Sequence, residues 1–100
     1  MAERLFVYGT LKIPTVQQVV FGRSILGMPD TLPGFRKSEV VLGLHRYPIA
    51  VPDPDGRIDG FVLELTPDEL ARGDEYETRA YRRVRATLKS GLEAWVYVQP

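Results

Sequence analysis

The start of the chain constrains the fold most, because three consecutive apolar residues, Leu5 to Val7, lead directly into a glycine-containing turn. An apolar run with no polar alternation predicts a strand buried on both faces, as in the interior of a sheet. The turn is Tyr8-Gly9-Thr10-Leu11, and Gly9 lacks the Cβ that would keep a ligand away from the backbone. Amides that are freed where a strand ends can bind a carboxylate. The sequence therefore predicts an interior strand that ends in a small-ligand binding loop.

The composition limits the number of domains and the kind of partner. With 100 residues, of which 44% are hydrophobic, we expect a single domain over residues 1–100. The 13 basic and 13 acidic residues cancel, so the chain has no general attraction to nucleic acid or to an anionic membrane. There is no cysteine, which excludes disulfides, thiolate nucleophiles and thiolate metal ligands. These features favour a small, roughly neutral partner and neither nucleic acid nor membrane.

Localisation follows from two further patterns. No apolar run approaches the roughly 20 residues that span a bilayer, and Met1 to Arg4 do not form a basic flank before an apolar signal core. We therefore expect a soluble and unexported protein, and the lack of cysteine agrees with a cytoplasmic setting. Nothing in the pattern selects an oligomeric state.

Two short helices are predicted from their end signals. The first covers Pro14 to Gly22, with Thr15 as N-cap, apolar Val16, Val19 and Val20 at helical spacing, and the glycine as its stop. The second starts at Thr66-Pro67-Asp68-Glu69, which matches a capping box with proline at the first helical position. It is expected to end near Arg72, before a polar turn.

The strands are predicted from apolar runs and from turn residues. Prolines and glycines are expected to break residues 23–35 into turns and short strands, and residues 52–56 (PDPDG) to form a turn. From Tyr81 onward, alternating residues and Ser90-Gly91 predict a β-hairpin. The remaining strands are expected at residues 36–44, 47–51 and 57–65. Five or six strands with two short helices indicate an α+β domain built on a small mixed β-barrel or a strongly curled sheet.

A candidate for chemistry is the acidic segment Asp74-Glu75-Tyr76-Glu77, which is expected to form a loop between the second helix and the hairpin. Loops on a rigid scaffold often carry function. A partly buried glutamate there would have a raised pKa and would exchange protons near neutral pH. Spacing alone favours a solvated acidic turn.

Motifs along nearly the whole chain resemble the γ-glutamylcyclotransferase-like family, which includes the γ-glutamylamine cyclotransferases and the AIG2-like proteins. The opening Val7-Tyr8-Gly9-Thr10-Leu11 resembles the substrate loop of this family, and Asp74-Glu75-Tyr76-Glu77 before Tyr81-Arg82-Arg83 resembles its acidic motif and the following strand. Three other segments resemble its Tyr-Pro segment, the strand before its capped helix and its closing strand: residues 44–49, 58–65 and 94–98.

The resemblance implies a reaction and the residues that carry it. Its general acid/base falls on Glu77 rather than Glu75, and its substrate loop on Tyr8, Gly9, Thr10 and Leu11. In such enzymes the α-amine of a γ-glutamyl group attacks its own γ-carbonyl, so that 5-oxoproline forms and the attached amine leaves. The resemblance implies neither cofactor nor metal. Because the nucleophile belongs to the substrate, no serine or cysteine is needed.

A second reading keeps the fold without the chemistry, as a module that binds a small metabolite or a peptide. Lys12-Ile13-Pro14 after the loop departs from the family pattern, as does Gly73 in place of the usual leucine. The part of the pocket that selects the leaving amine is expected to come from residues 12–35.

Other residue patterns favour structural roles. His45 is the single histidine, so a His-based metal site is excluded and a turn residue is favoured. The pattern Asp53-x-Asp55-Gly56 lacks the end glutamate of a calcium loop. Arginines near Tyr81 are expected on a solvated face, with Arg83 reaching an acidic residue. Three tyrosines are expected in the core or in a pocket wall: Tyr8, Tyr76 and Tyr97.

Overall fold

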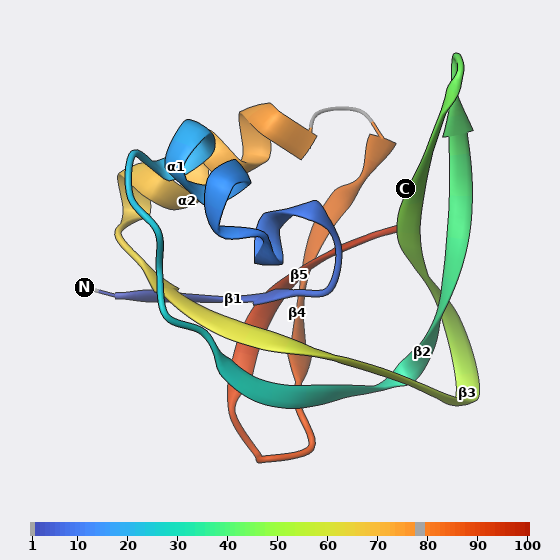
Figure 1. The fold of residues 1–100 in the computed structure, drawn as a ribbon. Helices are drawn as coiled ribbons and strands as arrows, with labels where there is room; N and C mark the ends of the chain where they lie inside the picture. The colour runs from blue at the N-terminus through green and yellow to red at the C-terminus, as the bar shows by residue number, and fades with distance from the viewer. Residues whose placement is uncertain (1, 78–79) are drawn as a thin grey trace.

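The computed structural model describes residues 2–77 and 80–100, and the described chain is an α+β fold around a strongly curled five-stranded sheet (Figure 1). The strand order is β2-β3-β1-β5-β4, in which β1 pairs antiparallel with β3 and parallel with β5. The strands are β1 Glu3–Val7, β2 Met28–Leu42, β3 His45–Leu65, β4 Arg82–Thr87 and β5 Glu93–Val98. The predicted fold class is confirmed.

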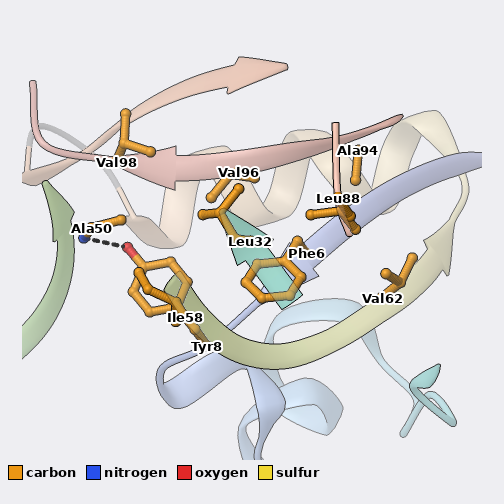
Figure 2. Packing of buried hydrophobic residues seen from close by; sticks show 10 residues of the cluster. All are labelled: Phe6, Tyr8, Leu32, Ala50, Ile58, Val62, Leu88, Ala94, Val96 and Val98. Carbon is orange, nitrogen blue, oxygen red and sulfur yellow. Dashed lines mark hydrogen bonds between the residues drawn. The ribbon is translucent and has the colours of Figure 1, made fainter. Parts of the chain in front are cut away.

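The central strand β1 carries both halves of the core. Leu5, Phe6 and Val7 are all buried, which confirms the predicted strand without a polar face. Alternate side chains point to opposite faces of a strand, so Phe6 packs inside the curl, with residues such as Leu32 and Val96 (Figure 2). Leu5 and Val7 pack on the other face, below the two helices. The site described below lies at the end of this strand.

The helices lie together on one side of β1 (Figure 1). Helix α1 covers Pro14–Phe21 and ends at Gly22, whose φ of 80° confirms the predicted stop. The predicted cap at Thr15 is wrong: Ile13 is the N-cap, because proline at position 14 fits the first helical position better than any other. Val19, which the helical spacing grouped with Val16 and Val20, has an exposed side chain.

Helix α2, Pro67–Glu77, begins with the predicted capping box. The Thr66 amide donates to Glu69 Oε1 at 2.9 Å, and the Glu69 amide donates to Thr66 Oγ1 at 3.1 Å. The predicted end near Arg72 is wrong, because the acidic segment forms the last turn of the helix instead of a loop. Contacts of Asp74 and Gly73 with β4 and β5 hold this turn in helical form, and they override the low helix propensity of glycine.

The structure differs most from the sequence prediction in the β2–β3 hairpin, which extends away from the helices (Figure 1). Residues 28–35 belong to one long strand, and residues 52–56 form an irregularity within β3 rather than a turn between strands. The register shifts between Pro33 and Phe35, where the Asp55 amide donates to Asp53 Oδ1 at 3.0 Å. Proline is tolerated in β2 because this strand lies at the sheet edge.

The β4–β5 hairpin is confirmed, with Gly91 at a φ of 93° in its turn. No helix within residues 2–77 or 80–100 is long and apolar enough to cross a membrane.

Candidate active site

The site begins where β1 ends, at Tyr8. This side chain is buried, and its hydroxyl donates to the Tyr97 carbonyl of β5 while accepting from the Ala50 amide of β3 at 3.0 Å (Figure 2). Burial raises the pKa of this phenol well above its usual range, so the hydroxyl stays protonated and both bonds persist at neutral pH. Tyr8 thus fixes the start of the loop to strands on both sides of β1.

The next residue must be glycine because of a neighbouring proline. A Cβ at Gly9 would lie 2.9 Å from Pro48 Cγ, closer than side chains approach each other. The predicted reason for this glycine was close approach to a ligand or a tight turn, and the structure adds close approach of Pro48. The Tyr-Pro segment of β3 therefore packs directly on the loop.

Thr10–Lys12 form a 3₁₀ helix, which no sequence pattern predicts. The first amides of a helix have no partner within it, so the amides of Thr10 and Leu11 are not used by this turn. The turn is held from behind by Gln17 of α1, which is only 2% exposed. Its Nε2 donates to the Leu11 carbonyl at 2.9 Å, and its Oε1 accepts from the Ile25 amide at 2.8 Å.

The other side of the site is the last turn of α2. Asp74 accepts a hydrogen bond from the Tyr97 hydroxyl at 2.8 Å and forms an ion pair with Arg83 at 3.2 Å. The ion pair confirms the prediction that Arg83 contacts an acidic residue. Gly73 is buried, and a Cβ there would lie 2.8 Å from Tyr97 Oη. The residue that departs from the family pattern thus makes room for the contact that anchors the turn.

Glu77 is the last residue of α2, and its carboxylate is partly buried. Burial raises its pKa from 4.5 to about 7, and no described residue donates a hydrogen bond that would lower it. Burial also raises the pKa of Tyr81 to about 12, with a smaller contribution from the charge of Glu77. At neutral pH the carboxyl therefore exchanges its proton beside neutral phenols.

Glu77 and the loop line the same cavity, which we call the inner pocket. Its lining comes from the end of β1 and the loop, from β3, from the end of α2, from the residue before β4 and from β5. The lining residues are Phe6, Val7, Tyr8, Gly9, Thr10, Leu11, Pro48, Glu77, Tyr81 and Tyr97. Its volume is about 20 Å³, which is room for about one water. The inner pocket is therefore narrow.

A larger cavity of about 230 Å³, the outer hollow, adjoins the inner pocket. Thr10, Glu77 and Tyr81 line both, and the other walls of the outer hollow are Leu42, Tyr47, Tyr76 and Ala80. The hydroxyls of Thr10 and Tyr76 lie 3.0 Å apart and connect the loop to α2 at this border.

All five site residues predicted from the sequence line the inner pocket: Tyr8, Gly9, Thr10, Leu11 and Glu77. Glu75 is exposed and lines neither cavity. Pro48, Tyr81 and Gln17 were not predicted as site residues. The Tyr-Pro motif was the available signal for Pro48, whereas nothing local marks Gln17. Within the described part of the chain, no group of three or more His, Cys, Asp or Glu side chains is placed to hold a metal ion.

A family model matches nearly the whole chain. That model is described as "Gamma-glutamyl cyclotransferase, AIG2-like" and matches residues 5–100, so the chain belongs to this family. AIG2-like protein C of Arabidopsis thaliana is 39% identical in an alignment 90 residues long that covers 82% of this chain and 47% of the relative. The chain thus spans about half the length of curated relatives that it matches.

Solved structures share the fold. A solution structure of an Arabidopsis thaliana protein is 31% identical with a TM-score of 0.84, and covers 98% of this chain and 68% of that one. A structure described as gamma-glutamyl cyclotransferase has a TM-score of 0.77 at 15% identity, over 100% of this chain and 68% of that one. An AIG2-like protein of Mus musculus has a TM-score of 0.76 at 20% identity, over 98% and 77%.

Proposed function

We propose that this chain is a γ-glutamylcyclotransferase that releases 5-oxoproline from a γ-glutamyl amine or amino acid, with Glu77 as general acid/base. The observation that carries the proposal is the juxtaposition of Glu77 and the loop of Tyr8 to Leu11 in one pocket. A carboxyl with a pKa of about 7 can accept and return a proton at neutral pH. Family membership supports this reaction class over other uses of such a carboxyl.

The reaction needs one proton relay and no nucleophile from the protein. The α-nitrogen of the substrate attacks its γ-carbonyl carbon, and a new carbon–nitrogen bond closes the five-membered lactam. Glu77 takes a proton from the attacking nitrogen and gives a proton to the leaving nitrogen as the old amide bond breaks. The products are 5-oxoproline and a free amine, so that the carboxylate is regenerated.

The loop would hold the reacting group. The amides of Thr10 and Leu11 and the Thr10 hydroxyl are donors for the α-carboxylate or for the oxyanion that develops on the γ-carbonyl. Donors that are already fixed stabilise such a charge most, because they need no reorganisation during the reaction. Gln17 provides this fixation from behind the loop.

The inner pocket must widen before it can hold the substrate of this reaction. A γ-glutamyl group is much larger than one water, so side chains at the border must move to admit it. The contact between Thr10 and Tyr76 is exposed and joins two partly exposed side chains, which makes it the part of the wall that yields most easily. The buried bonds of Tyr8 would remain in place.

The test is a comparison of Glu77→Gln with Glu75→Gln, monitored by 5-oxoproline release from a panel of γ-glutamyl amines and amino acids. Loss of the acid/base at position 77 is expected to lower turnover about 10²- to 10⁴-fold, whereas the exposed neighbour in the same helical turn is expected to be neutral. Equal turnover in the two variants would eliminate the mechanism. Thermal stabilisation by these compounds without product would instead support the metabolite-binding module.

A further inference from the structure

One residue of β5, Tyr97, is hydrogen-bonded to both sides of the inner pocket. Its backbone carbonyl accepts the bond from the Tyr8 hydroxyl, where the loop begins. Its own hydroxyl donates to Asp74 Oδ1 at 2.8 Å, in the last turn of α2. The loop and the turn that carries Glu77 are distant in the sequence, so this tyrosine links the two parts of the candidate site.

The last turn of α2 needs such a link to keep its shape. The final carbonyls of a helix have no partner within it, and helix ends fray unless other contacts hold them. Gly73 in this turn has a low helix propensity. Asp74 lies three residues before Glu77, and residues three apart are neighbours on a helix surface. A bond that restrains Asp74 therefore also restrains Glu77.

Tyr97 is suited to this role because its side chain is itself held in place. The residue is 6% exposed, and its ring packs against the ring of Tyr81 with the centroids 6.5 Å apart and the planes at 70°. A tyrosine side chain has only two rotatable angles, so the hydroxyl cannot shift far while the ring stays packed. Burial, together with the bond to Asp74, raises the pKa of this phenol well above its usual range, so that the hydroxyl remains a donor at neutral pH.

The other partner of Asp74 is a weaker restraint. Arg83 Nη1 lies 3.2 Å from Asp74 Oδ2, but the two side chains are 26% and 42% exposed. Ion pairs that reach solvent contribute little, because water and salt screen them. The Arg83 guanidinium also lies over the ring of Trp95, 4.4 Å from its centroid. The position of the turn therefore depends mainly on the buried tyrosine hydroxyl.

Resting on the proposed function, we propose that Tyr97 is a positioning residue, which through Asp74 sets the distance between Glu77 and a substrate held by the loop. Proton transfer requires heavy atoms within about 2.6–3.2 Å of each other, and a displacement of 1 Å can lower a rate about 100-fold. The bond from Tyr8 goes to the backbone carbonyl and does not need the Tyr97 hydroxyl. Loss of the hydroxyl should thus slow the chemical step and leave substrate binding by the loop intact.

Tyr97→Phe tests this role, because it removes the hydroxyl and keeps the ring and the carbonyl. The measurement is kcat and KM for 5-oxoproline release from the γ-glutamyl compound that the wild-type protein turns over fastest. We expect kcat to fall about 10- to 100-fold and KM to stay within about threefold. An unchanged kcat, or a loss confined to KM, would overturn the role. Arg85→Gln is the control: Arg85 lies on β4 like Arg83 and pairs with Glu93 at 3.7 Å outside the inner pocket, so neither constant should change.

Two variants of Asp74 separate the tyrosine bond from the ion pair. Asp74→Asn keeps an oxygen that accepts from the Tyr97 hydroxyl and removes the charge that pairs with Arg83, whereas Asp74→Ala removes both. The asparagine variant is expected to keep kcat within about threefold, and the alanine variant to lose as much as Tyr97→Phe. Combining Tyr97→Phe with Asp74→Ala should lower kcat no further, since both remove the same bond. Equal losses in the two Asp74 variants would show that the ion pair holds the turn and would overturn the proposal.

Hydrogen exchange separates failure of the positioning role from failure of the proposed function. In Tyr97→Phe the Glu77 amide, at the end of α2, is expected to exchange about tenfold faster or more. The Leu70 amide, which donates to the Thr66 carbonyl at 3.0 Å in the first turn, should change much less. A rise of equal size at both amides would overturn the local anchoring. If no compound yields 5-oxoproline but the rise is confined to the last turn, the proposed function fails and the anchoring stands. Turnover by the wild-type protein with the same kcat in Tyr97→Phe would refute the positioning role alone.

Discussion

The two ends of α2 carry glutamates whose pKa values are shifted in opposite directions. Glu69 lies in the first turn, where hydrogen bonds from Arg23 and from the Thr66 amide hold its pKa at about 2. Glu77 lies in the last turn, where burial without a described donor raises its pKa to about 7. Both carboxyls belong to one eleven-residue helix. The pKa values of the two carboxyls therefore differ by about five.

The helix itself contributes to this difference. A negative charge is favourable near a helix N-terminus and unfavourable near the C-terminus, because the peptide dipoles add along the axis. Glu69 satisfies the local rule, and its ion pair and capping bonds stabilise the fold. Glu77 violates it, and a group that costs stability in this way needs another reason to be present. Under the proposed function that reason is proton transfer.

The largest expected effect concerns the pH dependence of turnover. If Glu77 must be ionised to accept a proton, kcat/KM falls about tenfold for each pH unit below 7, and thus about 100-fold by pH 5. Glu69→Gln should keep the same profile, because that carboxyl lies outside the pocket. A profile that is flat between pH 5 and 8 in the wild-type protein would show that another group moves the proton.

Glu69→Gln is expected to lower the free energy of unfolding by about 2 kcal/mol at pH 7, a value discounted because Arg23 is half exposed. The folded pKa lies below the unfolded one, so this contribution is present above pH 4.5 and is lost as the pH falls toward 2. Urea denaturation at pH 7 and at pH 3 measures the change. Asp68→Asn, in the same turn but exposed, serves as control, and an equal loss in both would argue against the ion pair.

Glu77→Gln is expected to have the opposite sign and to raise stability by about 1–2 kcal/mol at pH 8, less than the full pKa shift because a buried amide also loses hydration. The folded pKa lies above the unfolded one, so the wild-type protein loses stability as the pH rises from 4.5 to about 7. The difference between the two proteins should thus vanish at pH 4. Denaturation curves at pH 4 and 8 decide this, and a variant that is destabilised at pH 8 would exclude burial as the cause.

The smallest effect tests how the last turn is anchored. Gly73→Ala brings a Cβ within 2.8 Å of Tyr97 Oη, so the usual gain of up to about 1 kcal/mol from alanine in a helix should be cancelled. Combining it with Tyr97→Phe removes the hydroxyl, and the pair should be more stable than the sum of the single changes. Additive effects in this double-mutant cycle would mean that contact with the Tyr97 hydroxyl is not the reason for glycine at position 73.

Local chemistry explains which elements were predictable. The capping box at Thr66, the stop at Gly22 and the turn of the β4–β5 hairpin each depend on neighbouring residues, and all three are confirmed. The extension of α2 to Glu77 depends on Tyr97 and Arg83, and the long β2 strand depends on pairing with β3. Such contacts join distant parts of the chain, and no local pattern reveals them.

The same division applies to the candidate site. Its two motifs were found because each is continuous in sequence, and the structure brings them into one pocket. Gln17 was missed because a buried glutamine within an apolar helix face resembles a solvated position until its partners, the Leu11 carbonyl and the Ile25 amide, are known.

The two hydrogen bonds of Gln17 have a further consequence for ligand affinity. A loop that is disordered before binding must lose conformational entropy when a ligand orders it, and this loss weakens the complex. Here a side-chain amide replaces the strand pairing that ends at Val7, so that the 3₁₀ turn is already held in one conformation. Under the proposed function, recognition of a carboxylate by the Thr10 and Leu11 amides then carries little ordering cost, and the entropy of the turn is lost during folding instead of during each binding event.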